Sequence, residues 1–321
     1  MCYTIFTTEQ TELYVQEVNI MTRTRTATWI HTGTDVRDCG NDVDRILEKA
    51  HLDYTVDKSP IFLPTGYEIK DKVATVRKED GVYIGVVSPT YEIYQNADAF
   101  RFISEIPNID ILKAGETHTG LVYMIGKLPD VKVLNDTFEP YVIFQTSHNG
   151  RYNVRATICP LRFVCQNQFA DAFKHISNTI DIRHSRRLPT LVAQAQELLT
   201  DTAEYMAGFT NSAEELAMLK IASRDTVYQI IDKFFDSTRE ISERQKALMD
   251  EKKELFMQCY LEEDNREFQG TVWGLTNAFA DYMTHRPRKN TAYSNESAFM
   301  SVTFDNKALS RFVELASSFA R

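Results

Sequence analysis

Two β-rich runs on either side of a His-Asn-Gly turn signal constrain the fold more than any other feature of this sequence. The runs lie within residues 139–165, and Asn149 and Gly150 stand between them. Asn and Gly tolerate the positive φ angles of a tight hairpin turn, so the two runs are expected to pair as neighbouring antiparallel strands. The centre of the chain is therefore predicted to be an antiparallel sheet.

Further strand patterns precede this hairpin. Residues 72–94 contain two alternating runs around a Glu-Asp-Gly turn, and residues 110–129 resemble two strands around a Gly-containing loop. The prolines of residues 57–64 favour a turn or an extended connection. Two short helices are also expected here, with Asn41 and Asn96 as their N-caps.

Helical patterns follow Cys165 and continue to the end of the chain. One of these helices is expected to begin at a capping box formed by Ser212 and Glu215. The acid-rich stretch 236–267 interleaves bases with its acids, which is typical of a solvent face or a subunit contact. The chain is thus predicted to change from a sheet to helices.

This order of patterns predicts an α+β fold, with a mostly antiparallel, hairpin-rich sheet, packed helices and a helical C-terminal half. We expect an irregular N-terminal arm at 1–28 and an α+β sheet domain at 29–187. A helical region at 188–321 is expected to pack on that domain or to extend it.

Charge and cysteine content restrict the environment and the partners. The 321 residues carry a formal net charge of −9, which argues against general coating of nucleic acid, so a polyanion site must be a local basic patch. Five cysteines without a CxxC spacing favour reduced thiols in the cytoplasm. No apolar run approaches the roughly 18 residues that span a membrane, and the start lacks the pattern of a signal peptide.

Such a patch is present in residues 151–187. Seven bases and two acids give this segment a charge of seven minus two, or +5. Guanidinium groups match phosphate oxygens, and amide side chains at a helix start add neutral donors for an anion. The candidate nucleic-acid-binding residues are Arg151, Arg155, Arg162, Gln166, Asn167, Lys174, Arg183, His184, Arg186 and Arg187. The alternative interpretation is a solvated charged loop on the outer face of a sheet.

Aromatic residues in or beside the strands could stack on the bases of a single strand, or could simply belong to the core. They are Tyr91, Tyr94, Tyr141, Tyr152 and Phe163.

Catalytic and metal-binding signals are sparse. The sequence contains no phosphate-binding loop, no dinucleotide fingerprint and no hydrolase motif, so neither an enzyme nor a cofactor is expected. Glu116 and His118 are a weak candidate for an acid–base pair. The spacings of His148, Cys159, Cys165 and His175 match no zinc module, so no metal site is expected.

Several blocks of the sequence occur in the order of a known family. They include GVVSPTYEIYQNADAFRFI, YVIFQTSHNGRYNVRATICPLRFVCQNQFADAF with IRHSRR, and GTVWGLTNAFADYMTHRPR. The chain resembles the phage/plasmid-like family called domain of unknown function 932 over roughly residues 29–320. That resemblance implies a resident of phage or mobile-element genomes. It also implies a distant similarity to phage single-strand annealing proteins, whose hairpin-rich sheet and helix assemble into rings.

The basic segment and the resemblance together predict a single-stranded DNA-binding protein that promotes annealing in recombination without ATP. Repeated subunits would extend the short basic track, so a homo-oligomer is expected, a ring being one form of it. The alternative is a protein-interaction module that binds a host or phage partner through its acidic helical half.

Overall fold

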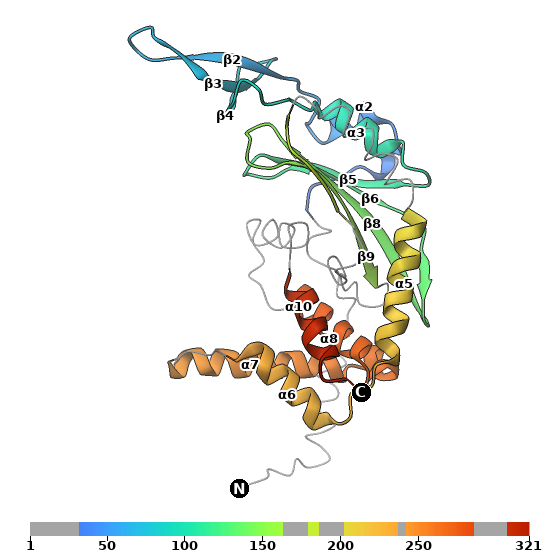
Figure 1. Ribbon diagram of the computed structural model, residues 1–321. Coiled ribbons are helices and arrows are strands. Elements are labelled where there is room, and N and C mark those ends of the chain that lie inside the picture. The colour runs from blue at the N-terminus through green and yellow to red at the C-terminus, as the bar shows by residue number, and fades with distance from the viewer. Residues whose placement is uncertain (1–31, 163–178, 186–201, 237–241, 286–306, 321) are drawn as a thin grey trace, which may run out of the picture.

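The computed structural model describes residues 32–162, 179–185, 202–236, 242–285 and 307–320 (Figure 1). Within these ranges the protein is α+β, as predicted, with antiparallel sheets in the N-terminal half and most helices in the C-terminal half. Of the helices in the described ranges, none is long and apolar enough to cross a lipid bilayer.

The main sheet is built around the predicted central hairpin. Its strands in the described part of the chain are β1 (Thr34–Asp35), β5 (Asp110–Glu116), β6 (Leu121–Lys127), β8 (Asp136–Ser147), β9 (Val154–Arg162) and β10 (Thr179–Ile182), in that spatial order, with β7 (Val131–Val133) beside β8. Neighbouring strands are all antiparallel. The β8–β9 pairing places Tyr141 opposite Cys159 and Gln145 opposite Arg155, which confirms the hairpin expected from Asn149 and Gly150.

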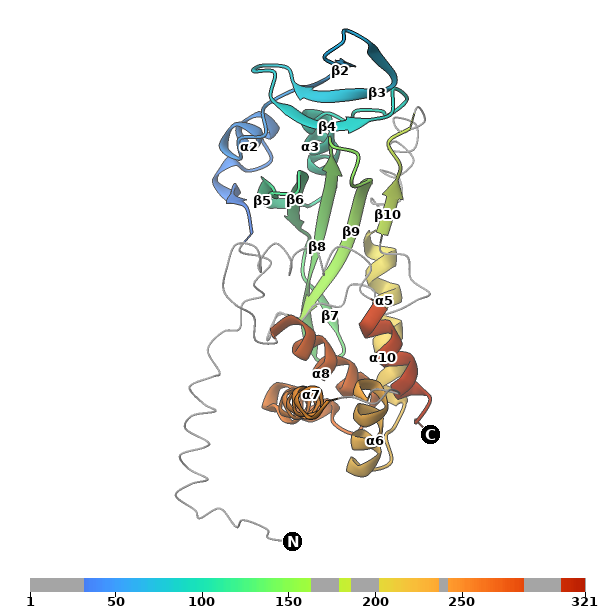
Figure 2. The same cartoon turned by 90° about the vertical axis from the view of Figure 1, so that its left-hand side faces the viewer.

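A second, small sheet projects from one end of the molecule (Figures 1 and 2). It consists of β2 (Val56–Phe62), β3 (Glu68–Arg77) and β4 (Tyr83–Val87), again all antiparallel. The β3–β4 hairpin confirms the pairing predicted within residues 72–94, although β4 ends at Val87, before the second predicted run does. The extended connection expected at 57–64 is in fact a strand, with Pro60 on the edge of the sheet, where a missing N–H costs no ladder hydrogen bond.

Helices α2 (Val43–Lys49) and α3 (Asn96–Ser104) pack on one face of the main sheet, beside the short helix η2 (Arg37–Cys39) (Figures 1 and 2). Phe100 and Ile103 of α3 join Phe144 of β8 in one buried cluster. Both predicted caps are off by one residue. Asp42 caps α2 by accepting from Arg45 N at 3.3 Å, and Gln95 occupies the N-cap of α3.

The helical half has its own buried cluster. Its elements are α5 (Thr202–Met218), α6 (Arg224–Phe235), α7 (Glu243–Leu261), η3 (Glu263–Phe268), α8 (Val272–His285) and α10 (Lys307–Ser317). Phe279 and Phe312 stack at 4.4 Å between ring centroids. Phe138 of β8 belongs to this cluster as well, packing 5.3 Å from Phe209 and 6.3 Å from Trp273. One strand therefore contributes to the cores of both halves.

Two features of these helices bear on the sequence predictions. The capping box expected at Ser212 and Glu215 is wrong, because α5 runs without a break through both residues. A capping box does occur at the start of α7, where Ser242 and Gln245 exchange hydrogen bonds. The first three turns of α7 are exposed on nearly every side and project from the molecule (Figure 1).

Candidate nucleic-acid interface

The structure describes four of the ten predicted contact residues in full. These are Arg151, Arg155, Arg183 and His184. Gln166, Asn167, Lys174, Arg186 and Arg187 lie outside the described residues, as does the side chain of Arg162.

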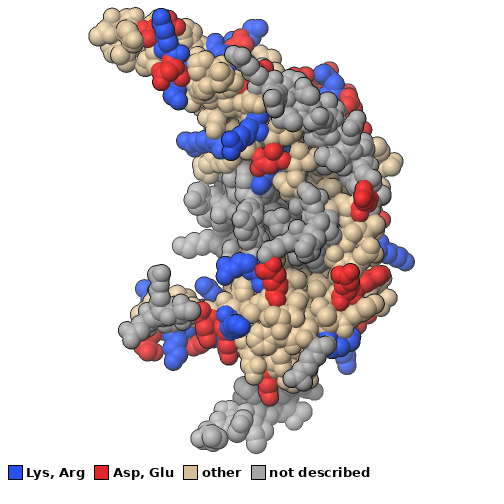
Figure 3. Space-filling view, in the orientation of Figure 1, with Lys and Arg blue, Asp and Glu red and all other residues tan. Residues whose placement is uncertain are grey.

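The four described residues come together at one end of the main sheet. Strand pairing sets Val154 opposite Ile182 at the shared end of β9 and β10 (Figure 2). The turn that carries Arg151 and the segment that carries Arg183 therefore leave the sheet side by side. Figure 3 shows Lys and Arg side chains just below the small sheet on one face of the molecule, with acidic side chains beside them.

The β8–β9 turn is held firmly from within the chain. Asn149 accepts from Arg151 N at 3.0 Å through Oδ1 and donates to Thr119 O at 2.8 Å through Nδ2. Gly150 adopts a φ of 75°, the conformation for which the sequence pattern selects glycine. Tyr91 donates from its hydroxyl to Ser147 O at 2.7 Å. The exposed Arg151 side chain is thus presented from a fixed backbone.

Arg155 is engaged within the chain. Its Nε donates to Asp181 Oδ2 at 3.2 Å, and the other oxygen of Asp181 accepts from Asn153 Nδ2 at 2.5 Å. Only 15% of the Arg155 side chain is exposed. The expectation that Arg155 stands outward for a polyanion is therefore corrected, because a carboxylate from the neighbouring strand already neutralises it. Neither Arg151 nor Arg183 has such a carboxylate among the described residues.

His184 also turns inward. Its ring stacks on Tyr91 with centroids 4.4 Å apart, and its Nδ1 lies 2.8 Å from the backbone oxygen of Glu92. Burial lowers the pKa of His184, so the ring is neutral near pH 7 and adds no positive charge. These two contacts of His184 hold the neighbouring Arg183 beside the β8–β9 turn.

His148 lies beneath the same turn, where sequence reasoning placed no interaction. It is buried, and its Nε2 lies 2.8 Å from Asn96 Oδ1, while Asn96 Nδ2 donates to Leu52 O at 3.0 Å. Since Asn96 Oδ1 can only accept, His148 carries its proton on Nε2. Burial lowers the pKa of His148 to about 4. The pair ties the turn to α3.

The four predicted stacking residues that the structure describes make contacts within the fold. Tyr91 and Tyr141 are buried, Tyr94 packs against the sheet-half core, and Tyr152 is half-buried with its hydroxyl 3.1 Å from Thr119 Oγ1. Phe163 lies outside the described residues. The most exposed aromatic side chains of the described ranges belong to the small sheet and its loops, and they are Phe62, Tyr67 and Tyr83. The alternation of apolar and polar residues in the sequence did not distinguish these exposed aromatic residues from those of the core.

Glu116, one of the two residues of the candidate acid–base pair, has a structural role. Glu116 accepts from the Tyr54 hydroxyl at 2.9 Å through Oε2, and the guanidinium of Arg77 lies over the Tyr54 ring at 4.4 Å. His118 is exposed in the loop that follows. This arrangement fixes the junction of the two sheets.

No metal site forms in the described ranges, where no three His, Cys, Asp or Glu side chains gather around a possible ion. His148 stands at the turn, whereas Cys159 lies at the opposite end of the same hairpin. Cys165 and His175 lie outside the described residues.

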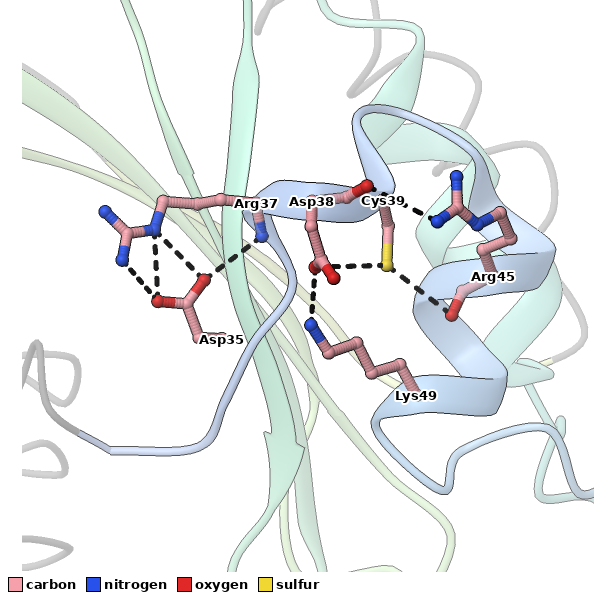
Figure 4. A network of polar contacts seen from close by, with 6 residues as sticks. All are labelled: Asp35, Arg37, Asp38, Cys39, Arg45 and Lys49. Carbon is pink, nitrogen blue, oxygen red and sulfur yellow. Dashed lines mark hydrogen bonds and ion pairs between the residues drawn. The ribbon is translucent and has the colours of Figure 1, made fainter.

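Two basic residues near η2, Arg37 and Lys49, are neutralised by carboxylates close by in the chain (Figure 4). The Arg37 guanidinium donates to both oxygens of Asp35 from Nε at 3.0 Å, which lowers the pKa of Asp35 to about 2. Lys49 forms an ion pair with Asp38. This set therefore offers little to a polyanion, and Arg151 and Arg183 remain the better candidates.

A comparison of the chain with known protein families gives a match over residues 83–311 to the family described as Domain of unknown function (DUF932). The matched range covers more than two thirds of the 321 residues. The chain belongs to this family. The family match includes the β8–β9 turn, β10 and the beginning of α10, while β2 and β3 precede it. No curated protein and no solved structure matches the chain. The predicted membership is confirmed, and the relation to phages stays a prediction.

Proposed function

We propose that this protein binds single-stranded DNA and promotes strand annealing without ATP, as a homo-oligomer in the cytoplasm of a cell that hosts a phage or another mobile element. The observation that carries the proposal is the placement of Arg151 and Arg183. Both side chains are exposed, both lack a carboxylate partner among the described residues, and both leave the same end of the main sheet.

The mechanism is clamping of the phosphate backbone. The two guanidinium groups bind phosphate oxygens, while Asn149 and His184 keep their backbones in place. The bases are not read by these contacts and stay available to pair. The remaining predicted contacts lengthen the track, and they are Arg162, Gln166, Asn167, Lys174, Arg186 and Arg187. Because one copy holds only a short stretch of strand, repeated subunits are needed.

A fluorescence-anisotropy titration with a labelled oligonucleotide in rising salt tests DNA binding. We expect a log–log slope of about −0.7 for each phosphate neutralised. Reversing two charges, in the double variant Arg151→Glu and Arg183→Glu, is expected to reduce the slope by about 1.4 and the affinity by more than about tenfold. Annealing is followed in parallel by energy transfer between complementary labelled strands, with no ATP present.

The matched control reverses two charges on the exposed turns of α7, through Arg244→Glu and Lys252→Glu. It changes net charge equally and is expected to bind DNA much as the wild type does. Undetectable or salt-independent binding by the wild type would contradict the proposal. So would equal losses in both double variants, since the effect would then reflect net charge alone.

A second candidate function is a protein-interaction module, favoured by the exposed turns of α7. A helix gains most of its stability from packing against other elements. The first three turns of α7 have almost no such packing among the described residues, so a partner protein is a plausible source of it. The double variant at Arg151 and Arg183 separates the two functions. Loss of DNA binding with normal folding favours annealing, whereas loss of assembly or solubility favours the interaction module.

A further inference from the structure

The small sheet turns one face toward the body of the protein. Thr75 on its central strand is fully buried and donates from Oγ1 to Gly85 O at 3.3 Å. Gly85 approaches the β8–β9 turn so closely that a Cβ there would lie 2.6 Å from Asn149 Cα. Because side chains alternate along a strand, the neighbours of Thr75 point to the opposite, outer face.

Part of the outer face is apolar, although a solvated sheet face is ordinarily polar. Ala74 stands between Ser59 and Val86 in one cross-strand row, and Val76 stands between Asp57 and Tyr83 in the next. Val86 is 46% exposed and Tyr83 is 63% exposed. The end of β2 and the loop from β2 to β3 add further exposed apolar side chains, those of Phe62, Leu63 and Tyr67. Such a patch marks an interaction site.

Charge identifies a second copy of this chain as the partner. Residues 56–87 contain five acids and five bases and so have no net charge, although the whole chain carries −9. Two copies of this segment therefore meet without repulsion from net charge. Asp57 stands opposite Val76 in the row next to the Ala74 row. Lys72 lies two residues before Ala74 on β3, so alternation places it on the same outer face, on the other side of the Ala74 row. Neither has an ion-pair partner among the described residues.

We propose that the outer face of the small sheet pairs with the same face of a second copy. The two-fold axis lies between the two sheets and runs along the Ala74 row. The axis brings Lys72 of each copy over the row that contains Asp57 of the other, so the Lys72–Asp57 ion pair forms twice, once in each direction. The two sheets then lie about 10 Å apart with their apolar rows in contact. A two-fold contact joins copies in pairs, so it supplies one of the contacts that the repeated assembly of the proposed function needs, and its role in annealing rests on that function.

Sedimentation equilibrium without DNA tests the pairing. The wild type is expected to be a dimer, and Val86→Asp to raise the dissociation constant by a factor on the order of 100, because two buried charges would lack partners. Leu248→Asp on α7 places the same charge at a residue of similar exposure, 48%, and is expected to leave the dimer intact. A monomeric wild type, or a Val86→Asp dimer as tight as the wild type, would overturn the proposal.

A charge swap tests the orientation and controls for misfolding. Asp57→Lys and Lys72→Asp are each expected to weaken the dimer, by roughly tenfold, and the double variant to restore it. Absence of rescue in a double variant with normal circular dichroism would overturn the two-fold arrangement. The sedimentation experiments contain no DNA. A negative result in them therefore does not affect the conclusion on DNA binding, and a negative anisotropy titration does not affect the conclusion on the dimer.

Discussion

Replacing Phe138 with alanine is expected to lower the free energy of unfolding by about 3–5 kcal/mol. Phe138 is fully buried, and its ring packs against Phe209 and Trp273 although it belongs to a strand of the main sheet. The substitution therefore removes apolar burial and leaves a cavity where the sheet meets the helices. Few other side chains of the described residues hold such a place in both halves.

Urea unfolding measured by circular dichroism and by tryptophan fluorescence gives the size of the effect. If the two halves unfold together in the wild type, the variant is expected to separate the two transitions, since it weakens their shared contact. Leu248→Ala on the exposed turns of α7 is the control, with an expected change within about 0.5 kcal/mol. A loss below about 1 kcal/mol for Phe138→Ala would show that the ring is not a shared anchor.

Acid is expected to destabilise the protein through His148 by about 3 kcal/mol between pH 7 and pH 4. The folded-state pKa of about 4 lies below the ordinary value of 6.5. Above pH 6.5 the ring is neutral in both states and the folded protein incurs no penalty. As the pH falls from 6.5 toward 4, the unfolded chain binds a proton that the buried ring of the folded protein does not bind. The free energy of unfolding therefore declines throughout this window.

The measurement compares urea unfolding of the wild type and His148→Gln at several pH values. Glutamine can donate to Asn96 but does not titrate, so the variant is expected to lose about 3 kcal/mol less than the wild type over this range. Groups common to both proteins cancel in the difference. His118→Gln replaces an exposed histidine and is expected to follow the wild type. Parallel pH curves for the wild type and His148→Gln would contradict the assignment.

Local signals in the sequence were sufficient for the elements they specify directly. The turn preference of Asn149 and Gly150 predicted the β8–β9 hairpin, and alternation predicted β3 with β4. The capping box was misplaced because Ser212 and Glu215 also fit the middle of a helix, where the buried Phe209 and Ala213 keep α5 continuous. Packing there outweighs a capping preference of about 1 kcal/mol.

The site could be predicted only in part, because its chemistry depends on pairs distant in sequence. Asp181 neutralises Arg155 across two strands, and Asn96 contacts His148 from a separate helix. A count of charges in one segment contains no information on either pairing. The apolar part of the outer face of the small sheet was missed for a similar reason. Both faces contain apolar residues, and the sequence does not show which face the body of the protein covers.

Because β8 contributes side chains to both buried clusters, it determines where the chain can be divided into fragments. Severing the chain after residue 187 would leave a C-terminal fragment without Val133 and Phe138, which complete its interior. Such a fragment is expected to bind hydrophobic dyes and to precipitate at concentrations where the intact protein does not, as dye fluorescence and light scattering would show. The expected boundary at 187 follows the change from strands to helices, but the buried interior crosses it.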